Sequence, residues 1–389
     1  MDIAGKKITV VGLGITSLAL VKLLLRLEAF PFVTEYASRK KVTALADMLD
    51  VLDVPYECGG HTDAALADAV LVISSPGVAP AIPFLKKTVE EGIPLMSEIE
   101  FASRFCRSKL IAVTGTNGKT TTTELIAHVM RSCGLDVGLC GNNDTPLSEV
   151  VAWEKQPEYL VLEVSSYQLE LADSFVPEIG VVLNLTNDHL VRHKTMENYA
   201  ATKARMFRNQ PPDAVAILNA DDPMVSAMGE EVKSRVLKFS QLHSKESVCC
   251  IEDDLLVEGV VVAQRSDSCL PGDHNTENIL AMLAVMSVLD ADCSAVADAL
   301  KTFSGVEHRI ERVAELEGVV FYNDSKSTNI DSLKVALESF DEPIVLIAGG
   351  EGKGSDYTLL SDVMQQGVKT LVALGTDAPK MIEAWGDKI

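Results

Sequence analysis

The segment 110–131 restricts the fold of this 389-residue chain more than any other stretch. It starts with a short apolar run, Gly115 and Gly118 flank a turn, and Lys119-Thr120 open a stretch whose apolar residues recur at helical spacing. The order strand, glycine loop, helix is typical of α/β folds with parallel sheets. We therefore expect an α/β protein organised around this loop.

The loop that begins at Gly115 is suited to bind the phosphates of a nucleotide. Its backbone N–H groups, the positive end of the following helix and the Lys119 ammonium converge on one place, and the Thr120 hydroxyl can hold Mg²⁺. Its glycines are closer together than in the general G-x-x-x-x-G-K-[ST] pattern, and an ordinary strand-to-helix turn is the alternative. The predicted nucleotide contacts are Gly115, Thr116, Asn117, Gly118, Lys119, Thr120 and Thr121.

Composition restricts the partners and the compartment. The chain has 34 Lys and Arg against 56 Asp and Glu, a net charge of −22, which argues against nucleic acid and anionic membranes as partners. Its 8 cysteines form no C-x-x-C pair, so we expect reduced, mostly buried thiols in a cytoplasmic protein. The apolar run 8–21 could imitate a signal peptide, but Gly12, Gly14 and Lys22 fit a strand, a turn and a helix better.

We expect three parallel-sheet domains, at 1–97, 98–305 and 306–389. The first begins as a Rossmann-like unit, with a strand at 8–13 and a helix at 17–27. The second alternates strands and helices as a larger P-loop domain, and the third restarts the alternation but reads as incomplete. The strands expected in the second and third domains are 109–114, 136–140, 159–164, 179–184, 214–219, 318–323, 344–349 and 370–375, with a β-rich patch at 235–264 and helices at 275–289 and 294–303.

Acidic side chains end two of the expected strands. Glu35 closes the strand 32–35, where a carboxylate can bind a ribose hydroxyl, and a solvated strand end is the equal alternative. Glu163 closes the strand that starts at Tyr159, at the place where a P-loop enzyme has its second Mg²⁺ anchor. A carboxylate inside an apolar run is costly unless it is paired or bound to metal, so we predict that Glu163 is a Mg²⁺ ligand.

A histidine and a lysine suggest a second metal site. Asp188-His189 follow another strand, although a lone histidine is usually structural. On the next predicted helix Lys203 shares the apolar face with Tyr199 and Phe207. A buried lysine loses its charge, pairs or is modified, and a neutral amine beside Mg²⁺ can take up CO₂ to become a carbamate ligand. The alternative is a lysine whose stem extends to solvent.

Taken together, the motifs resemble the Mur ligases, the ATP-dependent amide-forming enzymes of peptidoglycan synthesis. The matching pieces are Thr114-Gly-Thr-Asn-Gly-Lys-Thr120, Asp188-His189, His274-Asn275, His308-Arg309 and Asn323-Asp-Ser-Lys-Ser-Thr-Asn329, in that order along the chain. The closely spaced glycines are the form that this family uses. Gly12-Leu-Gly-Ile-Thr-Ser17 and Leu162-Glu-Val-Ser-Ser-Tyr-Gln-Leu169 look like the branch that adds D-glutamate to UDP-N-acetylmuramoyl-L-alanine.

The resemblance implies a catalytic role for several of these residues. Lys119 would hold the β- and γ-phosphates of ATP, Thr120 and Glu163 one Mg²⁺, and His189 with a carbamylated Lys203 the second. The residues implied to contact the adenosine or the phosphates are Asn275, Arg309 and Asp324. Those implied to face the acyl phosphate or the D-glutamate are Lys326, Thr328 and Lys353. Those implied to contact the UDP-muramoyl substrate are Ile15, Thr16, Glu35, Gly77 and Asn142.

Three departures from the family pattern affect these expectations. Asn143-Asp144 follow Asn142 where the family usually has Ile-Gly, and Tyr36-Ala37 follow Glu35 where polar and basic residues are usual. The chain also stops at Ile389, whereas family members continue through the rest of the third domain. We therefore expect a fragment of a longer enzyme that binds uridine-linked substrate but ligates poorly, with a less stable region 306–389.

Three other functions remain open. An NAD-binding protein built on the N-terminal glycine turn would leave the P-loop unexplained. A regulatory P-loop switch would hydrolyse ATP without joining substrates. The nearest alternative is a Mur ligase that adds alanine, a diamino acid or a dipeptide. If the chain is a Mur ligase of either specificity, its partners are small molecules, with no nucleic acid or membrane, and we expect a monomer.

Overall fold

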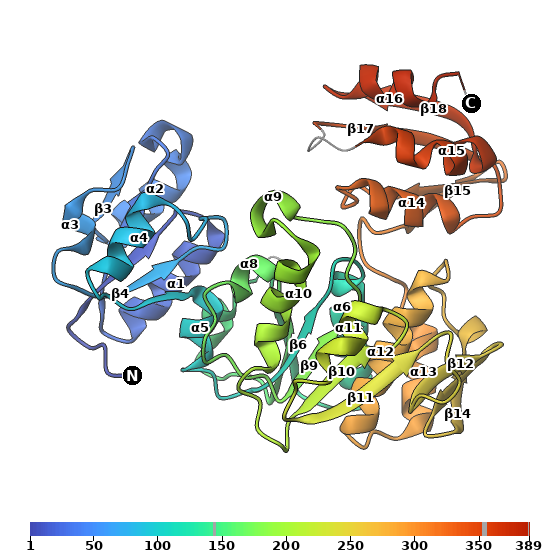
Figure 1. Ribbon diagram of the computed structural model, residues 1–389, viewed down its shortest axis with the longest axis horizontal. Coiled ribbons are helices and arrows are strands. Elements are labelled where there is room, and N and C mark those ends of the chain that lie inside the picture. Colours follow the sequence, from blue (N-terminus) through green and yellow to red (C-terminus); the bar gives the residue numbers. More distant parts are fainter. Residues whose placement is uncertain (143–144, 352–355, 388) are drawn as a thin grey trace.

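The computed structural model describes residues 1–142, 145–351, 356–387 and 389. Figure 1 shows a blue N-terminal region, a central region and a red C-terminal region in chain order, with the central one between the other two. The predicted substrate residue Lys353 and the pair Asn143-Asp144 lie outside the described residues. Within the described ranges, no helix has the length and apolar character that a membrane span requires.

The N-terminal region is built on a five-stranded parallel sheet of order β3-β2-β1-β4-β5. Its strands are β1 (Lys7–Val11), β2 (Phe30–Glu35), β3 (Tyr56–Cys58), β4 (Ala69–Ser74) and β5 (Leu95–Ser97). Its helices are α1 (Ile15–Arg26), η1 (Arg39–Lys41), α2 (Thr43–Val51), α3 (Asp63–Leu66) and α4 (Pro83–Glu90). Ser17 stands where a Rossmann fingerprint has its third glycine, and its hydroxyl lies 2.7 Å from both the Gly12 carbonyl oxygen and Ser75 Oγ. It thereby ties the glycine turn to the loop after β4.

The central region contains a nine-stranded sheet of order β14-β13-β12-β11-β10-β9-β6-β8-β7. The strands are β6 (Lys109–Thr114), β7 (Val137–Gly141), β8 (Tyr159–Glu163), β9 (Ile179–Val182), β10 (Val215–Asn219), β11 (Arg235–Ser240), β12 (Val248–Ile251), β13 (Asp254–Val257) and β14 (Val260–Gln264). Pairing is parallel from β7 to β12, and β13 and β14 add an antiparallel end. The β-rich patch is therefore partly antiparallel.

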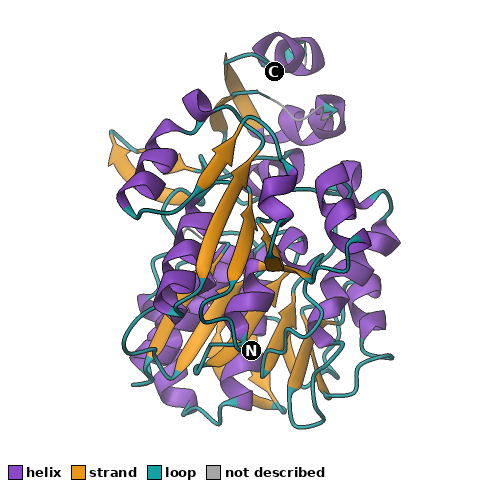
Figure 2. Ribbon diagram, turned by 90° about the vertical axis from the view of Figure 1, so that its left-hand side faces the viewer, coloured by secondary structure: helices purple, strands orange, loops and turns teal. Residues whose placement is uncertain are grey.

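Figure 2 shows helices (purple) on both sides of the strands. The helices of the central region are α5 (Glu98–Ser103), α6 (Lys119–Ser132), α7 (Leu147–Val151), α8 (Ser166–Leu169), α9 (Leu190–His193), α10 (Met196–Ala204), η2 (Arg205–Phe207), α11 (Pro223–Met228), η3 (Arg265–Asp267), α12 (His274–Val288) and α13 (Cys293–Thr302). Successive strand side chains point to opposite faces, so β6 serves two cores: Leu110 and Ala112 join one, and Ile111 and Val113 the other. This double burial fixes the position of Thr114, where the glycine loop between β6 and α6 begins.

The C-terminal region has two small sheets. An antiparallel pair joins β15 (Glu311–Leu316) to β16 (Val319–Asn323), and a parallel pair joins β17 (Ile344–Gly349) to β18 (Val368–Leu374). The helices are α14 (Ile330–Glu338), η4 (Tyr357–Leu360), α15 (Ser361–Gly367) and α16 (Ala378–Trp385). We predicted three strands here and missed β15, because its sequence Glu-Arg-Val-Ala-Glu-Leu contains no continuous apolar run. The lower stability of this region stays a prediction.

The eight cysteines are all free, as expected for reduced thiols. The expectation that most of them are buried is wrong. Cys140 and Cys249 are buried, Cys269 and Cys293 are exposed, and the others are partly buried. The sequence pattern around a cysteine did not indicate which face of its element meets solvent.

Candidate active site

The P-loop runs from the end of β6 to the start of α6, and its shape requires both glycines. Gly115 has φ of +155° and Gly118 has φ of +81°. A Cβ atom on Gly118 would lie 2.3 Å from Oδ1 of Asn278, so any larger residue would displace that amide. The loop is also held to the segment that follows β9, because the Asn117 N–H donates to Asn184 Oδ1 at 2.9 Å.

Lys119 folds back over this loop. Its ammonium donates to the carbonyl oxygens of Gly115 at 3.1 Å and Thr116 at 2.7 Å. Burial lowers the pKa of Lys119, and the Glu163 carboxylate opposes that effect. The side chain is half-buried at the loop, where an anionic ligand would satisfy it better than two neutral carbonyls.

Glu163 presents a buried carboxylate beside the P-loop. Its side chain is 2% exposed. Oε2 accepts a hydrogen bond from the Thr120 hydroxyl at 2.8 Å, and Oε1 accepts one from the Asn142 amide at 2.9 Å. Both donors are neutral. A charged carboxylate in such a position is costly unless a cation joins it.

The oxygens of Thr120 and Glu163 fit a magnesium ion. Hard divalent cations prefer oxygen ligands, and Mg²⁺ is commonly bound by one or two carboxylates together with substrate phosphates and water. The residues that the structure describes include no group of three His, Cys, Asp or Glu side chains that could enclose a metal. A Mg²⁺ here would therefore take the rest of its shell from a nucleotide and from water.

Lys203 lies inside the protein, as the helical spacing predicted. It is 1% exposed, and its Nζ donates to Thr114 Oγ1 at 3.1 Å and to the Gly115 carbonyl at 2.9 Å. Nζ also lies 4.7 Å from the centre of the Tyr199 ring. Burial, and next the charge of Lys119, hold the pKa of Lys203 well below its usual value. The alternative, a stem extended to solvent, is wrong.

Tyr199 lies against the P-loop, Lys203 and His189. Its hydroxyl is 3.2 Å from Thr116 Oγ1, and its ring centre is 6.3 Å from that of His189. Nδ1 of His189 is 3.0 Å from the Tyr167 hydroxyl. We did not single out either tyrosine for the site. The signal for Tyr199 was present, since it shares the apolar helix face with Lys203.

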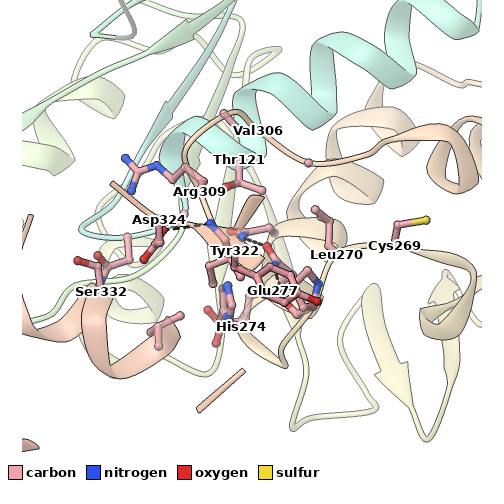
Figure 3. A pocket seen from close by; sticks show the side chains of 18 of the residues that line it. Thr121, Cys269, Leu270, His274, Glu277, Val306, Arg309, Tyr322, Asp324 and Ser332 are labelled. Atoms are coloured by element: carbon pink, nitrogen blue, oxygen red, sulfur yellow. Dashed lines mark hydrogen bonds between the residues drawn. The ribbon is translucent and has the colours of Figure 1, made fainter. Parts of the chain in front are cut away.

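A cavity of about 190 Å³ opens beside the P-loop. Its wall comes from the loop, the start of α12, the segment 304–312 that leads into β15, the end of β16, and α14 (Figure 3). The predicted nucleotide residues that it brings together are Asn117, Gly118, Thr121, Asn275, Arg309 and Asp324. Further wall residues, to which we assigned no contact, include Asn184, Glu277, Asn278, Tyr322 and His274, the last of which belongs to the motif His274-Asn275. Asn278 was detectable, because it follows Asn275 by one helical turn.

Three ionisable side chains in this wall, Arg309, Asp324 and Glu277, affect which ligand the cavity can hold. Arg309 Nε is buried and has no hydrogen-bond partner among the residues that the structure describes, a state that a phosphate oxygen would relieve. Asp324 Oδ1 accepts from the Ile310 N–H at 3.1 Å, and burial raises the pKa of its carboxyl. Burial, and next the charge of Asp221, raise the pKa of the Glu277 carboxyl to about 7.

The remaining predicted residues lie outside this cavity. Lys326 and Thr328 are exposed on the segment between β16 and α14. In the N-terminal region Ile15 is 65% exposed and Gly77 is also exposed, whereas Thr16 is half-buried. Both Glu35 carboxylate oxygens accept from backbone N–H groups, of Leu13 at 2.7 Å and Ala37 at 2.6 Å. Glu35 thus supports the glycine turn, and its contact with a uridine ligand stays a prediction.

Comparison with known proteins assigns the family. Residues 6–97 match the family described as "Mur ligase MurD-like, N-terminal domain", and residues 113–286 match "Mur ligase middle domain". The chain is 41% identical over 388 residues to the UDP-N-acetylmuramoylalanine--D-glutamate ligase of Pelotomaculum thermopropionicum, covering 98% of this chain and 85% of that protein. The chain belongs to the Mur ligase family. The UDP-N-acetylmuramoylalanine--D-glutamate ligase of Clostridioides difficile is 37% identical to this Mur ligase. The alignment covers 97% of this chain and 85% of that protein.

Solved structures agree with this Mur ligase in fold. UDP-N-acetylmuramate-alanine ligase from Thermotoga maritima has a TM-score of 0.64 at 20% identity, covering 97% of this chain and 87% of the other. MurF ligase of Thermotoga maritima, solved in complex with ADP, has a TM-score of 0.56 at 19% identity, covering 82% of each chain. At these identities the likeness concerns the fold alone.

Proposed function

We propose that this Mur ligase is an ATP-dependent ligase that adds D-glutamate to UDP-N-acetylmuramoyl-L-alanine, a step of peptidoglycan precursor synthesis. The observation that carries the proposal is the 41% identity, over nearly the whole chain, to a relative named for that reaction. The proposed phosphoryl donor is ATP, and we place the enzyme in the cytoplasm, where ATP is available, as a monomer that acts on small molecules.

The proposed chemistry has two steps. The alanyl carboxylate attacks the γ-phosphorus of ATP, so that an acyl phosphate forms and ADP leaves. The D-glutamate amine then attacks the acyl carbon and loses a proton, and the tetrahedral intermediate collapses to an amide and inorganic phosphate. Such transfers depend on positioning and on neutralising the charge of the phosphoryl group.

Residues of this chain supply much of that neutralisation in the proposal. Lys119 would exchange its contacts with the carbonyls of Gly115 and Thr116 for phosphate oxygens. Arg309, whose Nε has no partner within the described ranges, would donate to a phosphate from the cavity wall. Asn275 and Asp324 would orient the adenosine, which their place in the cavity wall supports.

We also propose two Mg²⁺ sites, whose ions would withdraw charge from the transferring phosphoryl group when bound. Thr120 and Glu163 would hold one ion, and their 2.8 Å contact supports this assignment. His189 and Lys203 would hold the other, with Lys203 as a carbamate: its neutral nitrogen bonds to the carbon of CO₂ and releases a proton. Deep burial and the lowered pKa of Lys203 support a neutral amine.

The remaining assignments concern the two other substrates. Ile15, Thr16, Glu35 and Gly77 would line the uridine diphosphate site, and Asn142 would contact the muramoyl group. For Lys326 and Thr328, and for Lys353 outside the described residues, we propose contact with the acyl phosphate or D-glutamate.

A panel of amino acids, assayed for ADP release, tests the proposed function. Release should require UDP-N-acetylmuramoyl-L-alanine and should be greatest with D-glutamate. Phosphate release that ignores both substrates would instead identify a P-loop hydrolase. A preference for alanine, a diamino acid or a dipeptide would identify another Mur ligase activity.

A further inference from the structure

Arg192, on the short helix α9, contacts two different regions of the chain. Its side chain is 14% exposed. Nε donates to both carboxylate oxygens of Glu170 at 3.0 Å, and Nη2 donates to Glu170 as well. Nη2 also donates to the carbonyl oxygen of Val78 at 3.0 Å, across 114 residues of sequence. Figure 1 shows α8, α9 and α10 on the part of the central region that faces the N-terminal region.

Val78 belongs to the loop that supports the N-terminal glycine turn. A Cβ atom on Gly12 would lie 3.1 Å from Val78 Cγ2 and equally close to the Ser75 side chain, so this loop packs tightly on the turn. The turn is further fixed by the Ser17–Ser75 hydroxyl contact. The Arg192 guanidinium therefore binds a loop whose position determines where the glycine turn lies.

On its other side Arg192 contacts the surroundings of His189. The guanidinium carbon lies 4.2 Å from the centre of the Tyr167 ring, and the Tyr167 hydroxyl is 3.0 Å from His189 Nδ1. The Arg192 backbone N–H also donates to the His189 carbonyl at 2.9 Å. One side chain thus joins the loop at Val78 to the aromatic ring that orients His189.

We propose that Arg192 is a positioning residue that sets the N-terminal glycine turn relative to His189. Its consequence for ligation rests on the proposed function, in which the glycine turn binds the uridine diphosphate and His189 the second Mg²⁺. In that case Arg192 fixes the distance between the glycine turn and His189, which lie at the two ends of one extended substrate site. Arginine suits this position because its planar guanidinium can donate hydrogen bonds to Glu170 and Val78 at the same time while its face stacks on the Tyr167 ring. The point charge of a lysine cannot do all three.

A matched control is available at the same junction. Arg26, at the end of α1, donates through Nη1 to the carbonyl of Ala152 just after α7. This contact also joins the N-terminal region to the central region through an arginine and a carbonyl. It involves neither the glycine-turn loop nor His189. Arg26→Ala therefore measures the loss of a junction contact by itself.

Hydrogen exchange by mass spectrometry on the whole chain tests the positioning directly. In Arg192→Ala we expect amides of both 75–79 and 187–194 to exchange about tenfold faster, the size of a lost charge-assisted hydrogen bond. Arg192→Lys should keep the charge at Glu170 but still accelerate 75–79, and it decides the matter if the alanine variant does not fold. Arg26→Ala should leave both segments unchanged. Acceleration of only one segment in Arg192→Ala, or equal acceleration of both by Arg26→Ala, would overturn the proposal.

Ligand measurements separate this inference from the proposed function. In Arg192→Ala the Kd for UDP-N-acetylmuramoyl-L-alanine and the Mg²⁺ concentration for half-maximal ADP release should each rise about tenfold, as for the loss of groups that orient metal ligands. Arg26→Ala should change neither. Values within twofold of the parent in Arg192→Ala would contradict a positioning role. If the parent chain binds no uridine-linked substrate, the proposed function fails, and the exchange data still decide the role of Arg192.

Discussion

Lys119 and Lys203 donate to the same backbone carbonyl, that of Gly115, at 3.1 and 2.9 Å. Two ammonium groups that share one neutral acceptor repel each other, and Lys203 is the more deeply enclosed of the two. The charge of Lys119 adds to burial in lowering the pKa of Lys203. The pair therefore favours a charged Lys119 and a neutral Lys203, which are the states that their proposed roles require.

Replacement of Lys119 should abolish ATP turnover and leave the fold intact. Lys119→Ala removes the cation of the P-loop without opening an apolar core, so we expect ADP release to fall by about three powers of ten or more. Far-ultraviolet circular dichroism and thermal unfolding check the fold. Lys109→Ala, at the exposed start of β6, is the control. Near-normal turnover in Lys119→Ala would refute the P-loop assignment.

Lys203 should carry a carbamate. After equilibration with ¹³C-labelled bicarbonate, the parent chain should give a carbamate carbon signal by NMR that Lys203→Ala lacks. That variant should lose most activity, and a small carboxylic acid in solution should restore part of it by replacing the missing anion. Lys233→Ala, which changes an exposed lysine, should keep both properties. Full activity of Lys203→Ala without added acid would rule out the modification as a functional group.

Alanine substitutions at Gly118 and Gly134 separate the steric effect of a side chain at the proposed nucleotide site from the effect of backbone strain. Gly118 and Gly134 have nearly equal φ values, +81° and +84°, but an added Cβ would meet Asn278 at 2.3 Å in the first and nothing within 4 Å in the second. Gly134→Ala should cost only the strain of a left-handed backbone, about 1–2 kcal/mol. Gly118→Ala has the same strain and also displaces Asn278, so we expect at least tenfold weaker ATP binding by calorimetry. Equal ATP affinities in the two variants would show that this contact has no role in the site.

Glu277 should make the protein less stable as pH rises. Its pKa is raised from 4.5 to about 7, so the folded state binds a proton more tightly than the unfolded state. The stability this contributes is present below about pH 4.5 and is lost as pH rises through 7, on the order of 3 kcal/mol in total. Glu277→Gln, which is neutral throughout, should therefore raise the Tm more at pH 8 than at pH 5. The same change in Tm at both pH values would disprove the pKa shift.

Local patterns predicted the positions that a single element determines. The helical spacing of apolar residues around Tyr199 correctly predicted that Lys203 is buried. The apolar run before Glu163 correctly predicted a strand that ends with this carboxylate beside the P-loop. Contacts between distant elements gave no local signal. Nothing in the sequence around Arg192 distinguishes it from an ordinary exposed arginine. Its hydrogen bond to the Val78 carbonyl, 114 residues away, is visible only in the folded structure. The wall residues Asn184 and Tyr322 were missed for the same reason.

The identity of the product tests the central claim most directly. The chain is incubated at high concentration with ATP, Mg²⁺, UDP-N-acetylmuramoyl-L-alanine and an equimolar mixture of amino acids that includes D-glutamate, and the uridine-linked products are identified by mass spectrometry. Even a slow enzyme then accumulates product. We predict one new species, UDP-N-acetylmuramoyl-L-alanyl-D-glutamate, formed in equal amount to ADP. ADP without any uridine-linked amide, or an amide of a different amino acid, would contradict the account.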